Sequence, residues 1–162
     1  MNANEYNQCV ENYSDALYRY VHRGFRHIDD AQDIVQHCFE KLWVKRDQIG
    51  MPEAKAFLFV SARNASIDDW RKNHRIVAFD TNGPRESGYE PDQEFETLDF
   101  ARECLQHLSE VQRSIFLLRE YEGHAYEEIA EQMELTLSQV KVNLFRARKR
   151  IHELMQAKKN VL

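Results

Sequence analysis

The chain has 162 residues, of which 30% are charged, and a formal net charge of −5. This length suits one ordinary domain or two small helical ones, and the scarcity of glycine and proline favours an all-helical fold. The sequence carries no recognisable signal peptide and no apolar run approaching the ~20 residues of a membrane span, so we expect a cytoplasmic protein.

Charge is distributed unevenly along the sequence. Seven acidic residues and one basic residue lie between Val77 and Asp99, whereas five basic residues and no acidic one lie between Lys141 and Arg150. Because local charge sets how a surface meets phosphates, the negative total does not exclude a nucleic-acid partner.

The sequence shows no pattern for a metal or for catalysis. Cys9, Cys38 and Cys104 are isolated, lack metal-ligand spacing and are a poor disulfide framework because their number is odd. His37 adjoins Cys38, but neighbours on a helix point about 100° apart. Gly-rich phosphate loops, HExxH, nucleophile elbows and paired carboxylates in an apolar setting are missing. We therefore expect no catalytic residue, metal or cofactor.

The first two predicted helices span residues 4–24 and 30–46. In the first, apolar residues recur at helical spacing until Gly24. In the second, Asp30 is the expected N-cap and one face is apolar. The other face is polar and is bordered by Trp43, a pattern equally typical of a docking surface and of a solvated face. This polar face holds Asp33, Gln36 and Glu40, with His37 at its margin.

A loop over residues 47–52 precedes a third predicted helix, residues 53–73. This helix is apolar on several sides, so we expect it to lie between neighbours at the centre of a first domain. Its C-terminal part is basic, but the helix dipole favours cations there by ~0.3–1 kcal/mol each, so the cluster alone is weak evidence for DNA binding. The cluster comprises Arg63, Asn64, Arg71, Lys72, His74 and Arg75.

Residues 77–97 have no sustained period and contain Gly83-Pro84, as linkers do. A structureless stretch of this length is uncommon inside one compact domain. We therefore predict an all-α fold of two small helical domains, residues 1–76 and 98–162. They are joined by a flexible acidic linker and should move independently about it.

The second domain is predicted to begin with a helix over residues 98–108. Ser109 and Gln112 form a capping box that starts the next helix, which continues to about Tyr121. Gly123 then ends it.

A helix-turn-helix is predicted over residues 126–154. Apolar residues at i, i+3, i+4 and i+7 from Tyr126 mark a short helix. Thr136 and Gln139 form a capping box that starts a longer one. Two helices joined by a short turn, the second carrying the cations, are typical of DNA-binding modules. The alternative is a basic amphipathic helix that only packs in a bundle.

The longer helix has two contrasting faces. The stripe predicted to be buried is Val140, Leu144, Ala147, Ile151 and Leu154. The opposite face is basic yet carries Val142 and Phe145, which a DNA groove tolerates because thymine offers a methyl group. That outward face comprises Ser138, Lys141, Val142, Phe145, Arg146 and Lys149.

Three stretches together resemble bacterial RNA polymerase sigma factors of the extracytoplasmic-function class, which consist of two helical domains, regions two and four, and a linker. DDAQDIVQHCFEKLW is similar to the region-two helix that binds the clamp helices of the polymerase β′ subunit. AFLFVSARNASIDDWRKN is similar to the next helix, which captures the non-template strand of the −10 element. LSEVQRSIFLLREYEGHAYEEIAEQMELTLSQVKVNLFRARKRI is similar to region four, which reads the −35 element. The order and separation of these stretches cover nearly the whole chain.

The resemblance implies partners and site residues. Asp33, Gln36, His37 and Glu40 would contact core polymerase through β′. Arg63, Asn64, Arg71 and Lys72, with the loop over residues 46–55, would meet the −10 strand. Ser138, Gln139, Lys141, Val142, Phe145, Arg146 and Lys149 would bind the −35 duplex. Region four would also contact the β flap, the linker would thread the polymerase channels, and an anti-sigma factor is the usual further partner. No small-molecule substrate is implied.

The sequence departs from the class pattern at three positions. His37 stands where an acidic residue is common. Glu134 occupies a turn position where glycine is usual, which costs about 1 kcal/mol if the residue is left-handed. Ala125 replaces the usual Ser or Thr cap, a loss of ~1 kcal/mol. These changes would soften the helix-turn-helix without abolishing it.

A second function class uses the same helix-turn-helix, namely a stand-alone transcriptional regulator whose first domain senses or dimerises. Such a protein should bind duplex DNA as a dimer, on half-sites about one helical turn apart. A sigma factor should be monomeric and should bind promoter DNA poorly without core polymerase.

Overall fold

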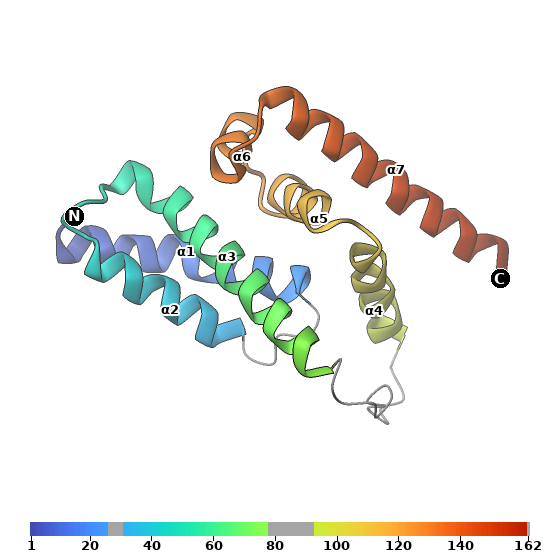
Figure 1. The fold of residues 1–162 in the computed structure, drawn as a ribbon, viewed down its shortest axis with the longest axis horizontal. Helices are drawn as coiled ribbons and strands as arrows, with labels where there is room; N and C mark the ends of the chain where they lie inside the picture. Colours follow the sequence, from blue (N-terminus) through green and yellow to red (C-terminus); the bar gives the residue numbers. More distant parts are fainter. Residues whose placement is uncertain (26–30, 78–92, 162) are drawn as a thin grey trace.

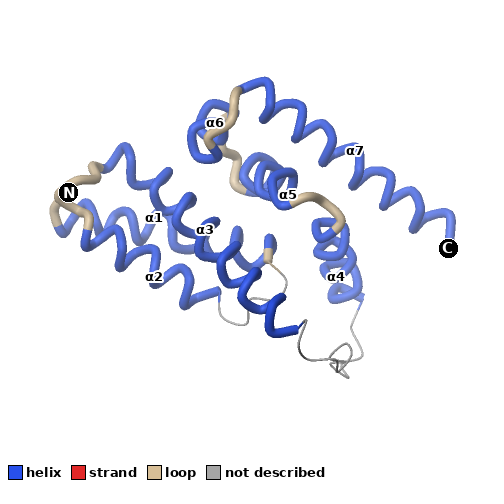
Figure 2. Tube along the Cα trace, in the orientation of Figure 1, coloured by secondary structure: helices blue, strands red, loops and turns tan. Residues whose placement is uncertain are grey.

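The computed structural model describes residues 1–25, 31–77 and 93–161, and their side chains over 1–25, 31–72 and 100–160. Every regular element in these ranges is helical (Figures 1 and 2). None of the described helices is long and apolar enough to cross a membrane. The elements are α1 (Ala3–Gly24), α2 (Ala31–Val44), α3 (Met51–Val77), α4 (Gln93–Gln106), α5 (Glu110–Phe116), the π-helix η1 (Leu117–Tyr121), α6 (Tyr126–Met133) and α7 (Leu137–Val161).

Helices α1, α2 and α3 form an N-terminal bundle (Figure 1). Helix α3 contacts both of the others and buries Leu58 and Phe59, which confirms its predicted central place. It begins at Met51, so the loop predicted over 47–52 is two residues too long. Pro52 lies in the first turn, where its missing N–H removes no helical hydrogen bond.

The predicted linker is shorter in the structure than in the sequence analysis. Helix α3 continues to Val77 and α4 begins at Gln93, five residues before the predicted start. Residues 93–97 are therefore helical, and the rest of the predicted linker, 78–92, lies outside the described residues, as does the N-cap expected at Asp30. Residues 93–97 lack apolar residues at helical spacing, but Glu and Gln have a high helix propensity, which favours a helix there.

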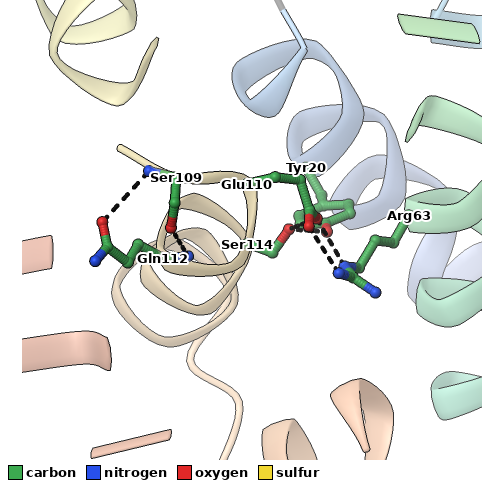
Figure 3. A network of polar contacts seen from close by, with 6 residues as sticks. All are labelled: Tyr20, Arg63, Ser109, Glu110, Gln112 and Ser114. Carbon is green, nitrogen blue, oxygen red and sulfur yellow. Dashed lines mark hydrogen bonds and ion pairs between the residues drawn. The ribbon is translucent and has the colours of Figure 1, made fainter. Parts of the chain in front are cut away.

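Helix α5 begins with the predicted cap. The Ser109 hydroxyl accepts from Gln112 N and the Gln112 side chain accepts from Ser109 N, which is the expected capping box (Figure 3). The α-helix gives way to a π-helical turn at Leu117, a feature no sequence pattern indicated. Gly123 has a φ of +67°, and its lack of a Cβ allows the chain to turn there.

Helix α7 is longer than predicted. The predicted helix-turn-helix ends at residue 154, but the helix continues to Val161. Gln, Ala and Lys have high helix propensity. In addition, the Lys158 ammonium lies 3.9 Å from the centroid of the Phe100 ring, in α4, and this contact ties the end of α7 to the bundle.

The two bundles share one continuous apolar core. Buried side chains of α1 and α3, such as Leu17 and Phe59, belong to the same cluster as Ile115 of α5 and Ile129 of α6. Contacts join α1 to α4 and η1, and α3 to α6. The bundles are thus closed upon each other, with α5 facing α1 and α3 (Figure 1). Cys9, Cys38 and Cys104 are all buried free thiols.

Candidate nucleic-acid and polymerase interfaces

The turn between α6 and α7 has the geometry of a helix-turn-helix. Glu134 adopts the left-handed conformation, with φ 54° and ψ 43°, and Leu135 N donates to Ala130 O over 2.9 Å. Thr136 and Gln139 then make the predicted capping box, at 2.9 and 3.1 Å. Ala125, at the N-cap of α6, makes no side-chain cap bond. The turn therefore forms despite a strained glutamate and a missing cap.

The two faces of α7 are separated as the sequence predicted. Val140, Leu144 and Ala147 are buried against the bundle, and Ile151 and Leu154 are half-buried. On the opposite side Val142 is 45% and Phe145 is 66% exposed. A basic helix that served only for packing would have no reason to present these two apolar side chains to water. All seven predicted −35 residues are exposed, namely Ser138, Gln139, Lys141, Val142, Phe145, Arg146 and Lys149.

Two members of this face have neighbours within the domain. The Gln139 side-chain oxygen accepts from Thr136 N, so its amide NH2 is the group available for a ligand. The Lys141 ammonium lies 5.8 Å from the centroid of the Tyr126 ring. Arg148, which flanks the face, is instead ion-paired with Glu120. The exposed cations on the face itself are Lys141, Arg146 and Lys149.

Three of the four predicted −10 residues lie on one cleft. It has a volume of about 740 Å³, and α3 and the α4–α5 junction line it, with Arg63, Asn64 and Arg71 among the lining residues. Lys72 is exposed but does not line it. Trp70 also lines the cleft and is 37% exposed. Trp70 was not among the predicted site residues, although its position beside Arg71 was a signal for an aromatic nucleic-acid contact.

Arg63 is engaged by the C-terminal bundle. Its Nε and Nη2 donate to the two carboxylate oxygens of Glu110, each over 2.8 Å. Ser114 Oγ donates to the same carboxylate over 3.0 Å and accepts from the hydroxyl of Tyr20 over 3.0 Å. Figure 3 shows this network, which joins α1 and α3 to α5. Arg63, which was predicted to contact DNA, therefore has its hydrogen-bond partner within the protein in this conformation.

The predicted polymerase-binding residues share the exposed face of α2. Asp33, Gln36, His37 and Glu40 are all exposed, and Gln36 Nε2 donates to Glu40 Oε1 over 3.2 Å. Trp43 borders them and is 40% exposed, with its ring 4.9 Å from that of Tyr6 and 4.2 Å from the Arg46 guanidinium. The two readings of Trp43 are thus compatible, because one side packs and the other remains at the surface.

Comparison with known proteins assigns both halves of the chain. Residues 9–76 match the family "Sigma-70 region 2", and residues 101–151 match "Sigma-70, region 4". The chain is a sigma-70 family sigma factor of the extracytoplasmic-function type. As such it is not an enzyme, and it directs promoter-specific initiation by RNA polymerase through regions 2 and 4.

Individual relatives support this assignment. The chain is 29% identical to the ferric citrate uptake sigma factor FecI of Escherichia coli (strain K12), over 69% of this chain and 68% of FecI. It is 26% identical to the RNA polymerase sigma factor YlaC of Bacillus subtilis (strain 168), over 92% and 87% of the two chains. Among solved structures, the sigma factor RpoE from Bartonella quintana, in complex with the anti-sigma factor NepR, superposes with a TM-score of 0.78. It is 28% identical to this chain, and the match covers 95% of this chain and 98% of RpoE.

Proposed function

We propose that the exposed face of α7 reads the −35 element in the major groove. The observation that carries this proposal is the division of α7 into a buried apolar stripe and an exposed face on which Arg146 and Lys149 stand beside Val142 and Phe145. Arg can donate to guanine edges, and apolar groups can contact thymine methyls. Ser138 and the Gln139 amide, at the start of the helix, suit a backbone phosphate.

Helix α3 holds the single-stranded −10 element in this proposal. Arg63, Asn64, Arg71 and Lys72 supply donors for the phosphates, and Trp70 supplies a ring on which a base can stack. The clustering of most of these side chains on one cleft supports the proposal. The segment from Arg46 to Lys55 leads into this helix and contributes to the same site.

The polar face of α2 docks on the β′ clamp helices of core polymerase, and region 4 contacts the β flap. Asp33, Gln36, His37 and Glu40 form this docking face, with Trp43 as its aromatic border. Their common exposure on a helix whose other side is buried supports the proposal. Aromatic side chains at the edge of a polar patch are frequent in protein interfaces.

An anti-sigma factor is the expected regulator, and the cytoplasm, where core polymerase is found, is the expected location. RpoE, which resembles this chain over nearly its full length, was solved with the anti-sigma factor NepR. Holding regions 2 and 4 away from polymerase would be the task of such a partner here.

Run-off transcription tests this function. Core polymerase and the purified protein are combined with genomic fragments that include the promoter of the protein's own gene. We expect transcripts that start at discrete positions and depend on both components. Absence of any specific start on all fragments, with a control sigma factor active in the same assay, would refute the proposed function.

A further inference from the structure

The cleft between α3 and the α4–α5 junction contains a buried guanidinium. Arg113 of α5 lines this cleft and is 7% exposed. Its guanidinium carbon lies 5.3 Å from the centroid of the Phe25 ring, and its Nε has no hydrogen-bond partner among the described residues. A guanidinium keeps its charge at neutral pH, and a buried charge is costly unless it is paired and hydrogen-bonded. We therefore looked for an acceptor that comes from outside the chain.

A second donor on the same cleft also has no partner. Gln106, the last residue of α4, lines the cleft, and its Nε2 is buried without a hydrogen-bond partner among the described residues. Where side chains are described, three buried nitrogen or oxygen atoms lack a partner, and two of them belong to Gln106 and Arg113 on this cleft. Native proteins leave few such groups unsatisfied. Because both groups are donors, the partner they require is an acceptor, such as the oxygens of an anion.

The charges that line the cleft favour an anionic ligand. Arg63 donates both hydrogen bonds of its fork to Glu110, so these two charges neutralise each other (Figure 3). Arg71 and Arg113 form no ion pair with a described carboxylate. Asp68 is the remaining acidic residue among the described lining side chains. Two guanidinium groups thus stand against one carboxylate, and their planar forks match the paired oxygens of a phosphate.

The other lining side chains suit a planar ring with polar edges. Trp70 is 37% exposed and offers a ring on which a base can stack. The amide of Asn64, like that of Gln106, can both donate to and accept from a base edge. The Asp68 carboxylate can accept from a sugar hydroxyl. The volume of about 740 Å³ lies within the range of small-molecule sites, roughly 300–1,000 Å³.

We propose that this cleft binds a free mononucleotide, whose phosphate accepts hydrogen bonds from Arg113 and Arg71 and whose base stacks on Trp70. The ligand is a small molecule and not the promoter strand, because Gln106 and Arg113 belong to region 4 and take no part in the proposed −10 site. The inference therefore does not depend on the proposed role of α3. Arg71 and Trp70 are also proposed to hold the −10 strand, so nucleotide and strand should compete for them.

Isothermal titration calorimetry of the full-length protein tests the site. The probes are AMP, GMP, CMP and UMP, with the four nucleosides and inorganic phosphate as partial ligands. We expect at least one nucleotide to bind with one-to-one stoichiometry, about tenfold more tightly than its nucleoside or phosphate alone, because phosphate contact and base stacking both contribute. No binding of any nucleotide at millimolar concentration would overturn the proposal. Phosphate that binds as tightly as the best nucleotide would also overturn it, because the base would then contribute nothing.

Three matched variants locate the phosphate. Arg113→Met and Arg71→Met should each bind the best nucleotide about tenfold more weakly, because a charge-assisted hydrogen bond is lost. Lys41→Met, at an exposed position of α2, removes the same charge and should bind as the wild type does. Arg71 is exposed, so its variant reports on the site even where Arg113→Met disturbs the fold. Wild-type affinity in both arginine variants would overturn the proposal.

Thermal unfolding separates a ligand-binding role of Arg113 from a structural one. Without nucleotide, Arg113→Met should unfold at or above the wild-type temperature, because an apolar chain replaces a buried donor that has no partner. Added nucleotide should raise the unfolding temperature of the wild type but not of this variant. A large fall in the unfolding temperature of Arg113→Met without nucleotide would show that the arginine serves the fold. These measurements use neither polymerase nor DNA, so their failure would leave the proposed function to its own run-off test.

Discussion

The hydroxyl of Tyr20 in α1 donates a 3.0 Å hydrogen bond to Ser114 Oγ in α5, and both side chains are buried. Burial raises the pKa of Tyr20 to about 12, so the hydroxyl remains a donor throughout the neutral range. This bond connects region 2 to the carboxylate that also holds Arg63.

Replacing Tyr20 by Phe should reduce the free energy of unfolding by ~0.5–1.5 kcal/mol, because one buried hydrogen bond is lost while the ring stays packed. Urea unfolding followed by circular dichroism measures the change. Tyr18→Phe removes a hydroxyl from an exposed position of the same helix and should have no effect. Equal destabilisation by both variants would mean that the Tyr20–Ser114 bond contributes nothing.

Stability should fall as the pH is lowered from neutral to mildly acidic values. Burial, with the nearby Lys55 ammonium, lowers the pKa of His124 below its usual range, against the opposing influence of Gln132 and two carboxylates. As the pH falls, the His124 imidazole is therefore protonated in the unfolded chain before it is protonated in the folded protein. The free energy of unfolding then decreases below about pH 6.5, by up to ~1.4 kcal/mol per pH unit.

Urea unfolding at several pH values tests this dependence. His124→Gln should flatten the slope between neutral pH and about pH 5.5, although His22, whose pKa burial also lowers, leaves a residual slope. His152→Gln, at an exposed position of α7, should leave the slope unchanged. A wild-type slope in His124→Gln would show that another group causes the pH dependence.

The left-handed turn residue offers a stabilising substitution. Glu134 has φ 54°, a conformation that glycine adopts without the steric cost of a Cβ. Glu134→Gly should therefore raise the free energy of unfolding by about 1 kcal/mol. Glu131→Gly, within the helical part of α6, should lower it by about the same amount. If both variants are destabilised alike, the turn carries no strain.

Local sequence signals predicted the second half of the fold well. Both capping boxes form, and α6 has the predicted bounds, because an N-cap and the residue three positions later interact whatever surrounds them. A steric cost was predicted at Glu134 if its backbone is left-handed, and the residue does have a positive φ. The apolar residues of α7 that recur at helical spacing pack against the bundle, so the opposite face of the helix is exposed.

Long-range pairings were not predictable from such signals. Arg63 and Glu110 are 47 residues apart, and their contact depends on how the two bundles face each other. No local pattern encodes that orientation. The same applies to η1, whose π-helical turn begins at Leu117, beside Gly24 of α1. The sequence therefore predicts candidate site residues but not the contacts that cover some of them.

The proposed docking face of α2 predicts selective loss of polymerase binding. Asp33→Ala or Gln36→Ala should reduce the affinity for core polymerase while leaving the unfolding curve unchanged, because both side chains are exposed. Glu11→Ala, at an exposed position of α1, is the control. Affinity is measured by fluorescence anisotropy of labelled protein. Unchanged affinity in both variants would move the docking face elsewhere.

The exposed position of Arg146 on α7 predicts a specific effect of its replacement on promoter recognition. Arg146→Ala should cost roughly 1–3 kcal/mol in discrimination of the −35 element, because a guanidinium that contacts a base edge is lost. Lys159→Ala removes the same charge near the far end of α7, beyond the proposed groove contact. Holoenzyme binding to promoters with intact and scrambled −35 elements measures the ratio. We expect a reduced ratio only in Arg146→Ala, with core affinity unchanged. A weaker affinity for both promoters at an unchanged ratio would instead assign Arg146 to the phosphate backbone, since backbone contacts carry no sequence information.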